Sequence, residues 1–132
     1  KIYVIQSLKD DEPQTGESLC EGILIPLAKK HGLGVTLWKV GTCAGFANAM
    51  RIIWEECSNS TPQIYPILHL DTHGSDDRTG IIVHPSRDHI PWVELLEQAR
   101  KINVACHNNL TVVSALCYGR LAISKISILE AS

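Results

Sequence analysis

The architecture follows from one run of residues, Ile64-Tyr65-Pro66-Ile67-Leu68-His69-Leu70-Asp71-Thr72-His73-Gly74. Residues 64–70 are almost continuously apolar, which is typical of a strand that is buried on both faces in a parallel sheet. The residues after them are polar and include glycine, so we expect a loop over residues 71–79. Because open parallel sheets bind ligands outside the carboxyl ends of their strands, the end of this strand is the first place to look for chemistry.

Strands and helices alternate on both sides of this run. β-branched and aromatic residues predict strands, and apolar residues spaced by three and four positions predict helices. The expected strands cover residues 2–6, 35–40, 64–70 and 110–116, the last of them buried; the expected helices cover residues 19–31, 43–57 and 91–106; a small hairpin covers residues 80–90. We therefore predict one α/β domain over residues 1–132, a three-layer sandwich around a mostly parallel sheet.

The first helix has recognisable signals at both ends. Ser18 and Glu21 have the spacing of a capping box, so Ser18 is expected to cap the helix, and Gly32 is expected to end it. Pro26 lies inside the helix and should kink it, because proline lacks an N–H donor and crowds the preceding turn. The apolar face that would contact the sheet consists of Leu19, Ile23, Leu24 and Leu27.

Composition and charge indicate an ordinary globular domain. The chain has 132 residues, 45% of them hydrophobic and 20% charged, and a net charge of −2. No basic cluster marks a surface for nucleic acid or anionic lipid, and no apolar stretch approaches the roughly 20 residues that span a membrane. Five cysteines without a CxxC pair favour neither structural zinc nor a disulfide framework. We therefore expect a cytoplasmic protein that binds neither nucleic acid nor membrane.

Two of the expected strands are followed by reactive side chains. His73 and Gly74 come after the strand of residues 64–70, and Cys117 comes directly after the strand of residues 110–116. Neighbouring strands lie about 4.8 Å apart, so matching strand ends can bring an imidazole and a thiol together. A free thiol, with a pKa of about 8.5, is mostly protonated at neutral pH. His73 as general base can take the proton of Cys117 and return it to a leaving amine.

Gly74 supplies a further requirement of acyl transfer. A glycine after the histidine lets a substrate approach the backbone without interference from a β-carbon. The backbone N–H groups of Gly74 and Cys117 can then bind the oxyanion, and loss of one such donor costs roughly 3 kcal/mol of transition-state stabilisation. A histidine before glycine, or a cysteine at a strand end, is by itself more often structural. Their occurrence together at two strand ends favours catalysis.

The order of these motifs resembles the caspase-like (clan CD) peptidases: His-Gly at one strand end, an amphipathic helix, then an apolar strand that closes with Ala115-Leu116-Cys117-Tyr118-Gly119. Residues 113–119 and 80–96 look closest to the CHAT proteases, relatives of caspases and separase. The resemblance implies a thiol protease acting on a protein or peptide, with His73 as base, Cys117 as nucleophile and Gly74 with Cys117 as oxyanion hole. It implies no cofactor and no essential third catalytic residue, and it suggests activation by a partner, as in bacterial antiviral defence.

The sequence departs from these relatives before and after the cysteine. Position 115 is alanine, where caspases have glutamine and metacaspases have an acidic residue, so the preferred residue before the cut stays open. Candidates for an acidic, substrate-binding pocket are Asp10, Asp11, Asp76 and Asp77, although each is more often a solvated loop carboxylate. Relatives carry further strands after this motif. We therefore expect a fragment of a larger protein, or one chain of a processed enzyme, that lacks its C-terminal strands until a second chain or segment completes the sheet.

Two other functions fit parts of the sequence. His69, Asp71 and His73 are alternate residues and so would point to one face of a strand, where they suit a metal-dependent hydrolase, with zinc keeping one position open for water. Against this, His69 lies inside an apolar run, and a metal site needs neither Gly74 nor Cys117. The other alternative is a catalytically silent caspase-like domain that serves as a docking module.

The remaining cysteines and histidines are interpreted as structural. The cysteines fall on or beside apolar helix faces and are expected to pack in the core; they are Cys20, Cys43, Cys57 and Cys106. The histidines fall in or near turns and are expected to face solvent; they are His84, His89 and His107.

Overall fold

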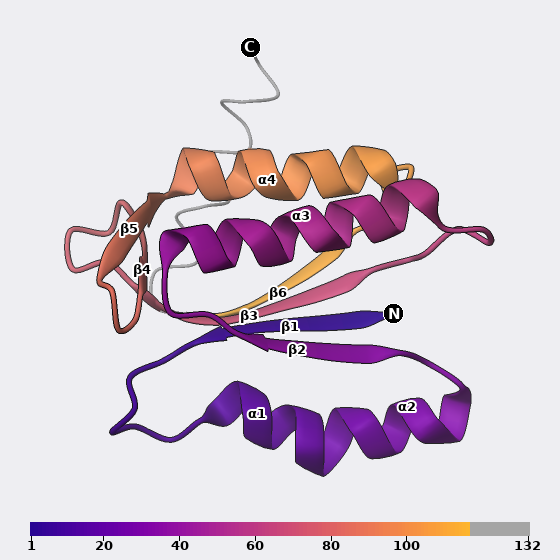
Figure 1. The fold of residues 1–132 in the computed structure, drawn as a ribbon, viewed down its shortest axis with the longest axis horizontal. Coiled ribbons are helices and arrows are strands. Elements are labelled where there is room, and N and C mark those ends of the chain that lie inside the picture. The colour runs from indigo at the N-terminus through magenta and orange to yellow at the C-terminus, as the bar shows by residue number, and fades with distance from the viewer. Residues whose placement is uncertain (117–132) are drawn as a thin grey trace.

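The chain has an α/β fold, as predicted. A computed structural model describes residues 1–116, and its elements run from β1 at the N-terminus to β6 (Figure 1). The strands are β1 (Ile2–Ser7), β2 (Val35–Lys39), β3 (Ile67–Gly74), β4 (Gly80–Val83), β5 (Asp88–Pro91) and β6 (Thr111–Ala115). The helices are α1 (Thr15–Leu19), α2 (Ile25–His31), α3 (Cys43–Asn59) and α4 (Trp92–Ala105), and a π-helical turn, η1 (Cys20–Leu24), joins α1 to α2.

The six strands form one mixed sheet, which corrects the prediction of a mostly parallel one. β1 lies between β2 and β3, and β6 pairs with β3; these three pairings are parallel. β4 pairs with the end of β3, and β5 pairs with β4; both pairings are antiparallel. The prediction was wrong because it ended the central strand too early to offer a partner to the hairpin of residues 80–90.

β3 is shifted along the sequence relative to the predicted strand of residues 64–70. It begins after Pro66, because proline has no N–H with which to join a hydrogen-bond ladder. It then runs on to Gly74, through residues that were expected to form a loop. Residues 71 and 72 pair with β1, and residues 73 and 74 pair with β4. His73 is therefore held by a strand rather than by a loop.

Helices cover both faces of the sheet: α3 and α4 lie over one face, and α1, η1 and α2 lie over the other (Figure 1). The main core lies under α3 and α4, where Phe46 and Ile102 pack in one cluster with Leu68 and Leu70 of β3. Buried residues recur at intervals of one to four positions in α3, as the apolar spacing predicts, and α4 buries Trp92, Leu95 and Ile102 on its predicted face. Trp54 is the main exception on α3, since it is 43% exposed.

The first helical segment begins earlier than expected. α1 starts at Thr15, and the predicted capping residue Ser18 lies inside it. The capping box is therefore not used: the side chain of the N-cap residue Gln14 makes no capping bond, and the backbone N–H of Glu17 donates instead to Oε1 of Gln6 over 2.8 Å. The predicted end is confirmed: Gly32 closes α2 with a φ of 65°, the left-handed conformation that glycine adopts without a steric penalty.

The turn η1 changes which side of this segment faces the sheet. It precedes Pro26, which lies in the first turn of α2, and a π-type turn takes up one more residue than an α-helical turn. Ile23 and Leu27, both predicted to contact the sheet, are instead exposed, whereas Cys20 and Ala28 are buried. The predicted apolar face is therefore wrong at these two positions, because it assumed uninterrupted α-helical winding, whereas Leu19 and Leu24 are half-buried.

β6 also differs from its prediction as a buried strand. All five of its residues, Thr111–Ala115, are exposed. One edge of β6 pairs with β3, and within residues 1–116 no strand pairs with the other edge. The side chains of β6 therefore lack the cover that a second neighbouring strand would help to provide.

The structure bears on two further expectations. Cys20, Cys57 and Cys106 are buried, and Cys43 is half-buried, so the described cysteines do pack in or beside the core. Across residues 1–116, none of the helices combines the length and apolarity that crossing a bilayer requires.

Candidate active site

His73 lies near the carboxyl end of β3, beside the segment that follows β1. Gly74 comes next and is the last residue of β3, paired with Ile81 of β4. The Nε2 atom of His73 is 2.5 Å from Oε1 of Glu12, and both side chains are partly buried. Glu12 belongs to the β1–α1 loop, residues 8–14. Because β1 and β3 are parallel neighbours, the chain that leaves the end of β1 passes close to the end of β3.

Hydrogen bonds within the β1–α1 loop hold Glu12 in place. The backbone N–H of Lys9 donates to Oε1 of Glu12 over 2.6 Å, and the N–H of Glu12 donates to the carbonyl of Lys9 over 3.3 Å. The Gln14 side chain donates to the carbonyls of both residues. Gln14 in turn accepts a hydrogen bond of 2.7 Å from the buried Gln6 of β1. A series of hydrogen bonds therefore connects the strand to the carboxylate that meets His73.

His84, the residue after β4, is the second neighbour of His73. The two imidazole centroids are 5.3 Å apart, and the ring planes are nearly perpendicular, at 88°. The backbone N–H of His84 donates to Oγ of Ser7 over 2.9 Å, which ties the end of β4 to β1. The expectation that His84 faces solvent is wrong, because β4 joins the sheet beside β3 and so brings His84 against His73.

The contacts around His73 shift the pKa values of both neighbours. The hydrogen bond from His73 lowers the pKa of Glu12, against a smaller opposing effect of burial. Glu12 is therefore a carboxylate at neutral pH and can only accept hydrogen bonds, so the shared proton belongs to Nε2 of His73. Burial lowers the pKa of His84, and the nearby His73 and Lys9 lower it further, so His84 favours its neutral form.

Cys117 lies outside the described residues, and so does the oxyanion donor assigned to its backbone. The strand before it is described: β6 is the parallel neighbour of β3, and Ala115 lies opposite Asp71. His73 follows Asp71 by two residues, and Cys117 follows Ala115 by two residues. The two strands that carry the motifs are thus neighbours, and the approach of thiol to imidazole stays a prediction.

The other four cysteines are poor candidates for a nucleophile. Burial raises the pKa of Cys20 and Cys43, and it raises the pKa of Cys57 to about 11. Cys106 is fully buried and donates weakly to the carbonyl of Asn103. A thiol that stays protonated or is shielded from solvent reacts slowly with electrophiles. The described cysteines therefore have a structural role.

All four acidic candidates for a substrate pocket are exposed, and three of them are not engaged in a turn of their own. Asp10 and Asp11 lie in the β1–α1 loop next to Glu12, and both are exposed. Asp76 is exposed in the turn between β3 and β4, which follows Gly74. These three carboxylates therefore belong to the β1–α1 loop, which contacts His73, and to the turn that follows Gly74. A bound peptide could reach them there.

Asp77 instead stabilises the turn between β3 and β4. Its Oδ1 atom accepts hydrogen bonds from both the hydroxyl and the backbone N–H of Thr79, over 2.6 and 3.1 Å, and from the hydroxyl of Ser75, over 2.7 Å. These bonds lower the pKa of Asp77 to about 2. Its charge is thus already engaged by the turn.

The geometry lends no support to the metal-site alternative. Oδ2 of the buried Asp71 accepts a hydrogen bond of 2.5 Å from Oγ1 of Thr15, whereas His73 meets Glu12. These two candidate ligands engage different partners instead of converging on one point. In the part of the chain that the structure describes, no three His, Cys, Asp or Glu side chains are grouped so that they could hold a metal ion.

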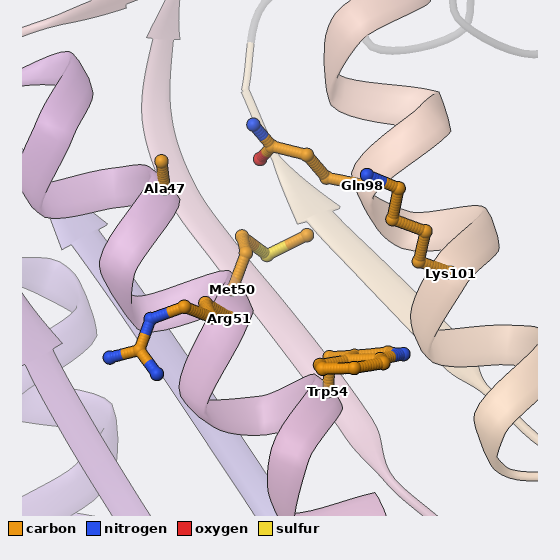
Figure 2. Close-up of a pocket in the computed structure, with 6 residues that line it drawn as sticks. All are labelled: Ala47, Met50, Arg51, Trp54, Gln98 and Lys101. Atoms are coloured by element: carbon orange, nitrogen blue, oxygen red, sulfur yellow. The ribbon is translucent and has the colours of Figure 1, made fainter. Parts of the chain in front are cut away.

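A hollow lies between α3 and α4 (Figure 2). It is lined by Ala47, Met50, Arg51, Trp54, Gln98 and Lys101. Its lining contains no thiol, imidazole or carboxylate, and it lies between the helices that cover one face of the sheet, whereas His73 meets the β1–α1 loop. The hollow therefore offers no group for the chemistry considered above.

Glu12 and His84 are not predicted from the sequence. A signal for Glu12 was present, because two parallel neighbouring strands end at the same edge, so the segment after the first strand must lie near the histidine of the other. Which of the three consecutive acids turns inward depends on the turn that Lys9 and Glu12 close. No local pattern shows that. His84 would have been found only from the pairing of β4 with β3.

Comparison with known proteins adds no family: no family model matches the chain, and no curated protein matches it.

Proposed function

We propose that this chain is the catalytic domain of a caspase-like cysteine endopeptidase of CHAT type, with Cys117 as nucleophile and His73 as general base. The observation that carries the proposal is the register of β3 and β6, in which Ala115 lies opposite Asp71. His73 comes two positions after Asp71, and Cys117 comes two positions after Ala115. Parallel neighbours end at the same edge of a sheet, which favours a thiol within reach of the imidazole.

The proposed reaction is peptide hydrolysis through a thioester. His73 takes the proton of the Cys117 thiol, and the thiolate attacks the substrate carbonyl. The oxyanion that forms accepts hydrogen bonds from the backbone N–H groups of Gly74 and Cys117. As the C–N bond breaks, the imidazolium gives its proton to the leaving amine. Water, deprotonated by the same imidazole, then hydrolyses the thioester and restores the thiol.

The exposed groups around the site suggest its setting. Asp10, Asp11 and Asp76 are accessible to a peptide and would favour a basic residue in the substrate, whereas Asp77 is engaged in its own turn. The exposed outer edge of β6 supports a sheet that a second chain or a further segment completes, within a three-layer caspase-like sandwich. By resemblance to the CHAT proteases, we propose a cytoplasmic enzyme of bacterial antiviral defence that a partner activates.

Selective alkylation tests the proposal. With iodoacetamide at pH 7, followed by peptide mapping, Cys117 should be modified faster than the four described cysteines, because burial protects those thiols. His73→Ala should slow the modification of Cys117 by at least about tenfold, and a chelator should have no effect. Cys117→Ala should abolish cleavage of a peptide library.

His31→Ala is the matched control, since His31 is exposed at the end of α2, and it should leave the reactivity of Cys117 unchanged. The proposal fails if Cys117 reacts no faster than Cys43, or if His73→Ala and His31→Ala behave alike. Cleavage that survives Cys117→Ala but is lost on adding a chelator would favour the metal-dependent alternative.

A further inference from the structure

We infer that Glu12 is the positioning residue of the catalytic base: its carboxylate holds Nε2 of His73 and thereby leaves Nδ1 as the nitrogen that takes the proton of Cys117. The inference rests on the proposed function and extends it, because the resemblance to caspase-like peptidases implies no essential third residue.

The hydrogen bond decides which nitrogen of His73 can act as a base. A neutral imidazole carries one N–H group, and its other nitrogen has a free lone pair. Glu12 accepts a hydrogen bond from Nε2 over 2.5 Å, so the lone pair is on Nδ1. Within residues 1–116, no hydrogen bond is made to Nδ1. A hydrogen bond at one ring nitrogen is the general means of selecting the tautomer at the other.

Glu12 is itself fixed before any substrate binds. The same Oε1 atom that meets His73 accepts the backbone N–H of Lys9, so a peptide group as well as the side-chain rotamer sets its position. Gln14 braces the loop on both sides of this contact and is tied to the buried Gln6. Groups that are held in their productive geometry need no reorganisation during the reaction.

The imidazole ring is also held from a second direction. His84 packs against it with the ring planes at 88°, and the backbone of His84 is tied to Ser7 of β1. One contact restrains the ring plane, and the hydrogen bond to Glu12 restrains its rotation within that plane. Together these two contacts restrain the orientation of the His73 ring.

The charge of Glu12 matters as well as its geometry. When the thiol gives up its proton, His73 becomes an imidazolium, which a carboxylate at hydrogen-bond distance stabilises. The cationic side chains that act on the neighbouring His84 are Lys9 in the β1–α1 loop and Arg87 in the turn after β4. Glu12 opposes their effect. Without it, Cys117 should ionise more like an isolated thiol.

The test is the pH dependence of Cys117 alkylation by iodoacetamide, between about pH 5 and 9, in the whole chain. Glu12→Ala should slow alkylation at pH 7 by about tenfold, the lower end of what a hydrogen bond to a charged group contributes. It should also move the rate profile to higher pH, toward that of a free thiol at about 8.5. Glu12→Gln keeps an oxygen that can accept hydrogen bonds from both N–H groups but lacks the charge. Its alkylation rate at pH 7 should therefore fall by only about threefold.

Two further variants separate the possible failures. Glu21→Ala removes an exposed carboxylate of η1 and should match the wild type. If His73→Ala slows alkylation while both Glu12 variants match the wild type, Glu12 has no positioning role. The proposed roles of His73 and Cys117 are then still supported. If His73→Ala has no effect, the proposed function itself fails.

A faster reaction in Glu12→Ala would also overturn the inference, since it would show that the carboxylate restrains the base. Because Glu12→Ala also removes a brace of the loop, circular dichroism and thermal unfolding accompany each variant. Should Glu12→Ala fail to fold, Glu12→Gln decides, by the shift of its profile to higher pH. With a cleavable peptide, a positioning role lowers kcat and leaves KM unchanged.

Discussion

The two faces of β3 are held by different kinds of contact. On the face toward α3 and α4, Leu68 and Leu70 are almost fully buried in the main core. Beyond them, on the opposite face, Asp71 and His73 meet polar groups that follow β1, among them Glu12. Apolar contacts are non-directional and depend on area, whereas each polar contact needs one partner in one geometry. The alternation of side chains along one strand thus separates the apolar contacts that stabilise the fold from the residue proposed as the base.

The largest effect should come from truncating the apolar face. Leu68→Ala should lower the free energy of unfolding by about 3 kcal/mol, because it removes buried methyl groups and leaves a cavity. His73→Ala, on the partly exposed opposite face, should cost less than about 1 kcal/mol while it removes the proposed base. Urea unfolding followed by circular dichroism measures both. Equal losses in the two variants would show that stability and chemistry are not separated on β3.

The same contrast explains what the sequence can predict. Periodicity identifies α3 and α4, because apolar burial leaves a pattern in the sequence. The apolar run of residues 64–70 indicates β3 but predicts burial on both faces, whereas Ile67 is exposed and Leu68 and Leu70 are buried. The neighbourhood of His73 depends instead on the course of the β1–α1 loop and on the pairing of β4, which join residues far apart in the chain. Glu12 is 61 positions from His73 in the sequence. The candidate histidine was therefore accessible to sequence reasoning, and its partners were not.

Thr72 offers an intermediate effect on the apolar face. It is buried, and its Oγ1 atom has no hydrogen-bond partner among the described residues. Thr72→Val replaces an unpaired hydroxyl with a methyl group and should stabilise the fold by about 1 kcal/mol. Thr111→Val, on the exposed strand β6, is the matched control and should change stability by less than about 0.5 kcal/mol. A loss of stability in Thr72→Val would mean that the hydroxyl serves a bonding partner.

The smallest effect concerns the pH dependence of stability on the polar face. The pKa of Glu12 is lowered in the folded chain, mainly by the hydrogen bond from His73. Its contribution to stability is therefore fully present above the usual carboxyl value of 4.5 and is lost as the pH falls through the lowered value. Glu12→Gln should unfold with a weaker pH dependence in this acidic range. Urea unfolding midpoints measured between about pH 3 and 7 test this. If the midpoint changes with pH equally in the wild type and in Glu12→Gln, the prediction is contradicted.

The π-helical turn η1 accommodates one residue more than an α-helical turn would, without interrupting the helical segment. Successive residues of an α-helix are rotated by about 100°, so one residue more or less upstream re-aims every side chain that follows it. Deleting a residue between Cys20 and Leu24 would restore regular winding and turn the outward Ile23-to-Leu27 surface toward the sheet. The length of this short segment, more than its composition, thus sets which side chains α2 presents to the outside.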